Sequence, residues 1–138
     1  MVSYIWLLLM KYYKVKKFAR EANKLKATDK LLSDTLVHFL ETSDDERQKY
    51  SLGAGLYKLR LATNEGQGKS GGSRTILAFK TDNRIIWLHL FAKNDKGNVT
   101  TNELKKLKSL ADILLELSAS DMARLIKLGE LYEVNEHV

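Results

Sequence analysis

Cationic side chains gather in the middle of the chain, and their types and spacing suit binding to phosphate. The group consists of Lys58, Arg60, Lys69 and Arg74. No acidic residue occurs between Glu65 and Asp82, so the charge of this region is uniformly positive. The planar guanidinium of arginine binds two phosphate oxygens at once, and lysine supplies a compact positive charge. These residues therefore predict a site for a phosphorylated partner.

The stretch GQGKSGGSRTILAFK at 66–80 contains Gly-Lys-Ser, the ending of a nucleotide-binding P-loop. A P-loop also needs a glycine where this chain has Thr63, and a helix after the loop to bind the phosphate. Here Gly71 and Gly72 follow Ser70, and the apolar run after them predicts a short strand. We therefore interpret the stretch as a glycine-rich connection between two strands.

Alternation of apolar and polar residues predicts the strands that position the cations. Three segments, 56–62, 73–80 and 84–94, form a predicted antiparallel meander with a turn at 81–83. One face of the meander is expected to carry apolar residues that pack on helices. The other face is expected to carry Lys58, Arg60, Arg74, Lys80, Trp87, His89, Phe91 and Lys93. Cations that hold phosphates beside rings that stack on bases favour RNA binding, and an ordinary solvated sheet face is the alternative.

Helical spacing predicts two helices before the meander and two after it. The first follows a short strand at 12–15 and covers 16–26, and the second begins at Thr28 or Asp29 and ends near Glu41. The third begins with the capping-box pair Thr100 and Glu103. The fourth is predicted to begin at Ser120 and to end at Gly129. The predicted fold is a small single α+β domain, with an N-terminal helical hairpin on a twisted antiparallel sheet and C-terminal helices.

The composition fits one domain with a positive net charge. The chain has 138 residues and a formal net charge of +6, which favours nucleic acid or an acidic protein as the partner. It has no cysteine, so disulfides are excluded and a reducing cytoplasm is the expected location. The three histidines, His38, His89 and His137, are widely spaced. We expect no metal site and no cofactor.

The N-terminal residues are apolar but do not predict a membrane segment. YIWLLLM, at 4–10, is far shorter than the about 20 residues that a membrane-spanning helix needs, and it lacks the features of a signal peptide. We interpret 1–9 as an N-terminal extension and 10–138 as the domain. An extra strand or a hydrophobic flap is the alternative for the extension.

The central motifs resemble the RelE/HigB-type toxins of bacterial toxin–antitoxin systems. The similarity lies in GAGLYKLRLATNEGQGKSGGSRTILAFK and WLHLFAKNDKGNVTTNELKKLKSLA, and it continues into SASDMARLIKLGELYEV, so that it covers roughly 10–134. The matching pattern is a glycine-rich entry, a Lys-x-Arg strand, a Gly-Lys-x-Gly-Gly-x-Arg loop and Phe-Ala-Lys-Asn before a helix. The basic loop contains no acidic residue, so the pair of carboxylates usual for acid–base catalysis is absent from it.

The resemblance implies a RelE-like fold and a ribosome-dependent endoribonuclease that cuts mRNA and stops translation. It implies a cognate antitoxin encoded in the same operon, a DNA-binding helix-turn-helix protein, as the partner besides mRNA on the ribosome, and no membrane. By motif position it implies Lys58, Arg60 and Arg74 as catalytic residues and Lys69 and Lys93 as RNA-binding residues. We add His89 to the catalytic group, and Lys80 and Trp87 to the RNA-binding group, from their positions on the predicted face.

The predicted chemistry uses the neighbouring 2′-hydroxyl as nucleophile and needs no metal. A base takes the hydroxyl proton, and cations stabilise the charge that grows on the phosphate. Lys58 or His89 is the candidate base. Two other functions stay open: a ParE-like toxin that blocks DNA gyrase by binding, and a regulatory RNA-binding protein without activity. The antitoxin is expected to bring an acidic or amphipathic segment to the basic face or to the helical surface beside it.

Overall fold

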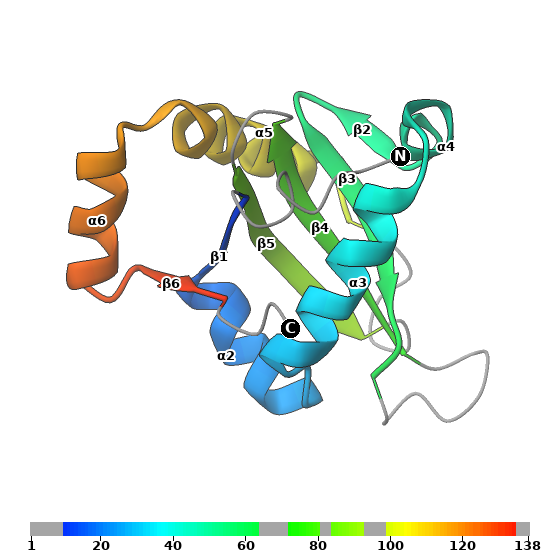
Figure 1. Ribbon diagram of the computed structural model, residues 1–138, viewed down its shortest axis with the longest axis horizontal. Helices are drawn as coiled ribbons and strands as arrows, with labels where there is room; N and C mark the ends of the chain where they lie inside the picture. The colour runs from blue at the N-terminus through cyan, green and yellow to red at the C-terminus, as the bar shows by residue number, and fades with distance from the viewer. Residues whose placement is uncertain (1–9, 64–71, 81–83, 93–98, 135–138) are drawn as a thin grey trace.

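The protein is built around one six-stranded sheet with helices on both faces (Figure 1). The computed structural model describes residues 10–63, 72–80, 84–92 and 99–134. The strands are β1 (Lys11–Val15), β2 (Ser51–Gly53), β3 (Leu56–Leu61), β4 (Ser73–Lys80), β5 (Arg84–Ala92) and β6 (Leu131–Glu133). The helices are α2 (Lys16–Leu25), α3 (Asp29–Glu41), α4 (Asp44–Gln48), α5 (Thr101–Glu116) and α6 (Ala119–Lys127). The predicted α+β class is therefore confirmed, whereas the predicted extension at 1–9 lies outside the described residues.

The sheet has the strand order β2-β3-β4-β5-β1-β6. The meander β3-β4-β5 is antiparallel, as predicted. However, β1 runs parallel to β5, so the sheet is mixed and the prediction of a wholly antiparallel sheet is wrong. The edge strands β2 and β6 were not predicted, because segments of three residues are too short to show alternation.

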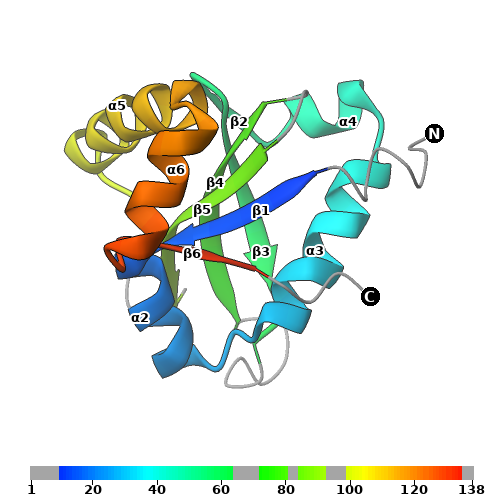
Figure 2. The same ribbon diagram turned by 60° about the vertical axis from the view of Figure 1, so that its left-hand side comes forward.

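Helices pack on both faces of the sheet, which corrects the prediction of a single apolar face. One cluster joins α2 and α3 to the sheet through Phe18, Leu36, Leu77 and Trp87, among others. The second joins α5 and α6 to the opposite face through Ile76, Ile86, Ala111, Leu114 and Met122, among others. Figure 2 shows α5 and α6 on one side of the sheet and α3 on the other.

Side-chain caps fix where the helices begin. Thr28 accepts from the Leu31 N–H at 3.2 Å at the start of α3, and Thr100 and Glu103 form the predicted capping box of α5. The prediction that Ser120 caps the last helix is wrong. Ser118 is the cap, because its hydroxyl reaches the Asp121 N–H at 3.0 Å, and α6 therefore begins two residues earlier.

Gly129 ends α6, as predicted. Its φ of +77° is a left-handed conformation that favours glycine. The Gly129 N–H donates to the Ile126 carbonyl and the Glu130 N–H donates to the Leu125 carbonyl, each at 3.0 Å. This pair of bonds is a Schellman motif, which satisfies carbonyls left over at the helix end and turns the chain into β6.

The short helix α4 was not predicted, because its polar sequence DDERQ has no apolar stripe. Arg47 anchors it: the side chain is buried and donates from Nη1 to the carbonyls of Leu40 and Thr42 at the end of α3. No helix in the described ranges is both long and apolar enough to cross a membrane.

Candidate nucleic-acid interface

The register of the meander brings the predicted cations together on one face. Directly opposed residues in adjacent strands share a face of the sheet. Arg60 lies opposite Arg74, and Arg74 lies opposite Phe91 on β5. In the next row, Ile76 lies between Lys58 on β3 and His89 on β5. We call Lys58, Arg60, Arg74 and His89 the cationic face.

Arg74 is at the centre of the cationic face. Arg60 is its direct neighbour, with an expected Cβ–Cβ distance of about 5 Å for an opposed pair. Lys58 and His89 lie diagonally from Arg74 on either side, and such diagonal pairs are about 7–8 Å apart. Long cationic side chains at these separations can reach one phosphate group from three directions.

A β-bulge places His89 on this face. Leu77 pairs with Trp87, but Ile76 pairs with His89, so Leu88 is an extra residue in β5. The Thr75 hydroxyl donates to the His89 carbonyl at 2.8 Å, which ties β5 to β4 directly after the bulge. His89 therefore joins Lys58 and Arg74, although strict alternation would put it with Trp87.

Trp87 lies on the opposite face, in the core beneath α2. Its exposed fraction is 0%, and its ring centroid is 5.6 Å from that of Phe18. The prediction that Trp87 is an exposed aromatic beside the cations is therefore wrong. The bulge is the reason, because it reverses the alternation between Trp87 and His89. Phe91 stays beside the cations but is only 6% exposed, with its ring centroid 5.3 Å from the His89 ring, so it supports His89.

Arg60 and Arg74 are directly opposed cations in adjacent strands. Like charges directly opposite each other in adjacent strands destabilise a sheet. The Nη1 atom of Arg74 is buried and has no hydrogen-bond partner among the residues that the structure describes. Arg60 is exposed on β3, beyond the residues that pair with β2, and it also lines a groove beside α3. A bound anion would remove the repulsion between the arginines and supply the missing acceptor.

The opposite end of the same sheet face is covered by α5, which closes it to a large ligand. Leu56, Ala78 and Ile86 pack there in the cluster with Ala111 and Leu114 of α5. Lys80 lies at this covered end, about 20 Å from Arg74 by the rise of a strand. Its ammonium forms an ion pair with Glu116, and this hydrogen bond lowers the pKa of the Glu116 carboxyl. The structure therefore separates Lys80 from the other predicted site residues.

The glycine-rich connection enters the sheet beside Arg74. Gly72 has a φ of +82°, and an added Cβ would lie 3.0 Å from the Leu61 carbonyl oxygen, so only glycine fits here without strain. The hydroxyls of Thr63 and Ser73 lie 3.1 Å apart and join the two strand ends. The next element is the strand β4, which confirms that this segment is not a P-loop. Lys69 and Lys93 lie outside the described residues.

The described part of the chain is a small α+β domain in which Lys58, Arg60, Arg74 and His89 share one face of the sheet. The chain belongs to the RelE toxin family: residues 10–134 match the family described as "RelE toxin of RelE / RelB toxin-antitoxin system". It is therefore a toxin of a toxin–antitoxin system, and the family implies a cognate antitoxin as its partner. No individual curated protein matches the chain.

Proposed function

We propose that this toxin is a metal-independent endoribonuclease that cleaves mRNA on the ribosome and so inhibits translation. The observation that carries the proposal is the position of Arg74, with Arg60 directly opposite and Lys58 and His89 on its two diagonals. A DNA gyrase inhibitor that acts by binding alone does not need such a cluster. Membership of the RelE toxin family supports the same reading.

In the proposed reaction the 2′-hydroxyl oxygen attacks the adjacent phosphorus, and the bond from phosphorus to the 5′-oxygen of the next nucleotide breaks. Lys58 or His89 accepts the hydroxyl proton, and the departing 5′-oxygen takes a proton from the other of these two side chains or from water. Arg74 and Arg60 donate to the phosphoryl oxygens, where negative charge grows in the transition state. Lys69 and Lys93 are proposed to hold neighbouring phosphates, whereas Lys80 and Trp87 are left out of the proposed site.

Primer extension on a translated mRNA tests this function. We expect new 5′ ends in the message when the purified protein is added to programmed ribosomes, and none when the same mRNA is free of ribosomes. Cleavage of free mRNA at the same rate would contradict the dependence on the ribosome. Binding without any cleavage would favour the regulatory alternative, and loss of DNA supercoiling by gyrase would favour the ParE-like one.

RNA binding by the cationic face should weaken steeply with salt. Each phosphate contact to a single strand contributes about −0.7 to the slope of log K against log salt, so the three contacts of Lys58, Arg60 and Arg74 predict a slope of at least about −2. A titration of labelled RNA should therefore lose about 16-fold in affinity between about 50 and 200 mM salt. Arg74→Ala should reduce the slope by about one contact. A flat salt dependence would contradict the role of the cationic face.

A further inference from the structure

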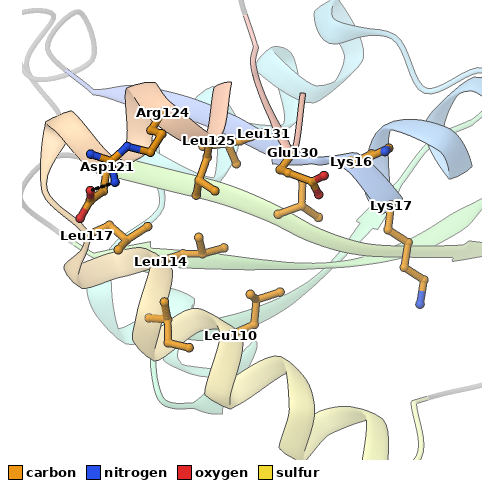
Figure 3. A pocket seen from close by; sticks show the side chains of 12 residues that line it. Lys16, Lys17, Leu110, Leu114, Leu117, Asp121, Arg124, Leu125, Glu130 and Leu131 are labelled. Atoms are coloured by element: carbon orange, nitrogen blue, oxygen red, sulfur yellow. Dashed lines mark ion pairs between the residues drawn. The ribbon is translucent and has the colours of Figure 1, made fainter. Parts of the chain in front are cut away.

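A second surface is an open groove between α5, α6 and the junction of β1 with α2 (Figure 3). Its volume is about 680 Å³. The lining is largely apolar and includes Leu110, Ile113, Leu114, Leu117, Leu125 and Leu131. The four residues of the cationic face do not line it. The groove is therefore a separate feature of the molecule.

The apolar side of α5 is wider than its own core needs. Leu114 is turned into the core, whereas Leu110 and Ile113 on the groove side are exposed, Ile113 to 59%. With Leu117 these residues recur at helical spacing and form a continuous stripe along the groove. Contiguous exposed apolar side chains beside a groove are typical of a surface that binds another helix.

Charge at the α2 end of the groove indicates an acidic occupant. Lys16 and Lys17 line this end, and they form the first turn of α2, which contains no acidic residue and has no side-chain cap. The helix dipole therefore adds to their positive charge. At the α6 end, Arg124 pairs with Asp121 at 3.3 Å and the two charges balance. Glu130 lies at the α2 end, where its backbone carbonyl accepts from the Lys16 N–H at 3.1 Å, so its carboxylate offsets one of the two lysines and one positive charge remains in excess. A second copy of this chain is disfavoured as occupant, because each copy carries a formal net charge of +6.

We propose that this groove binds an amphipathic helix of the cognate antitoxin. The apolar side of that helix packs on Leu110 and Ile113, and its carboxylates lie toward Lys16 and Lys17. The inference rests on the proposed function, because it takes the neutralising antitoxin as the partner. It assigns antitoxin binding and RNA cleavage to different surfaces, since docking in the groove leaves Arg74 and its neighbours in place. Variants in the groove should therefore escape the antitoxin and remain toxic.

The test compares Ile113→Gln with Leu128→Gln as its matched control. Both residues are exposed aliphatic side chains in the C-terminal helical part of the chain. Leu128, 66% exposed, does not line the groove. Binding to the antitoxin, taken as the product of the adjacent gene, is measured by isothermal titration calorimetry. We expect Ile113→Gln to raise Kd by at least about 30-fold, as for an interface hot spot, and Leu128→Gln to stay within about 3-fold. Both variants should keep the parental melting temperature within about 3 °C.

Cleavage on ribosomes distinguishes a failure of this inference from a failure of the proposed function. Ile113→Gln should cleave mRNA at the parental rate and stay toxic when the antitoxin is co-expressed. Unchanged binding of the antitoxin to Ile113→Gln would overturn the groove as the docking site, whatever the cleavage result. An absence of cleavage by the parental protein would overturn the proposed function and leave the binding comparison valid. Failure of the parental protein to bind the antitoxin would overturn the partner itself.

The charge of the rim gives a second, independent measurement. Lys17→Glu reverses one charge at the α2 end without removing apolar surface. We expect a lower association rate and a weaker salt dependence of antitoxin binding, because a rim charge acts mainly on the encounter of the two proteins. An association rate equal to that of the parental protein at low salt would contradict an acidic occupant.

Discussion

Arg74→Ala is expected to lower the rate of mRNA cleavage on programmed ribosomes by about 10²–10³, the usual cost of removing one donor to a developing phosphate charge. Arg74 is the central residue of the cationic face, so its loss removes the group to which Arg60, Lys58 and His89 are all neighbours. Folding should be nearly unaffected, with a change in the free energy of unfolding within about 0.5 kcal/mol. The reason is that truncation removes both the repulsion from Arg60 and a buried Nη1 atom without a partner in the described part of the chain.

The chain offers a matched control on the same strand. Lys80 lies on the same face of β4 as Arg74 but at the end covered by α5, where it pairs with Glu116. Lys80→Ala should therefore leave the cleavage rate within a factor of about 3, because it removes only an exposed ion pair about 20 Å from Arg74. Arg74→Lys should recover only part of the rate, because a lysine cannot make the two-pronged contact. If Arg74→Ala melts normally and cleaves at the parental rate, the proposed site is wrong.

Arg47→Ala is expected to destabilise the protein by about 3 kcal/mol, the cost of leaving buried carbonyls without a donor. The buried guanidinium donates to the Leu40 carbonyl at 3.3 Å, to the Thr42 carbonyl and to the Asp44 carboxylate. It also lies 5.8 Å from the ring centroids of Phe39 and Phe79, which adds cation–π attraction. One side chain thus joins the end of α3, the helix α4 and the sheet. Truncation leaves the Leu40 carbonyl without this buried donor, whereas the Asp44 side chain is 83% exposed and is hydrated by water.

Thermal unfolding measures this effect. The expected loss corresponds to a fall in Tm of about 10 °C for a chain of this length. Lys30→Ala is the control, because it removes an exposed ion pair with Asp34 and should change the free energy of unfolding by less than about 0.5 kcal/mol. Below the melting transition, Arg47→Ala should cleave mRNA at close to the parental rate. Equal Tm values for the two variants would show that Arg47 does not anchor α4.

The sequence by itself determined the elements whose signals are local. A period of two residues placed Lys58 and Arg60 on the same side of β3, and the register opposite β4 confirms that Arg74 shares it. The spacing of Thr100 and Glu103 located the start of α5, since a capping box involves only four consecutive residues. The helices α2 and α3 and the meander were predicted correctly for the same reason.

Pairings between distant segments required the tertiary structure. The strand β1 pairs in parallel with β5, whose residues come some 70 positions later in the chain, and no local pattern specifies such a partner. The alternating residues Ile76 and Ala78 are apolar on the side that carries the cations, and only the packing of α5 explains why. The groove beside α5 likewise depends on where α6 and the end of β1 lie.

The bulge at Leu88 decided the composition of the cationic face. Strict alternation in β5 puts Trp87, His89 and Phe91 on one side, whereas in the structure Trp87 is in the core and His89 lies beside Lys58 and Arg74. A bulge forms where two strands must stay paired while one has an extra residue, so it depends on the fit of β5 to β4 and to the helices on both faces. The sequence of β5 alone does not predict the bulge, because the same residues alternate equally well without it.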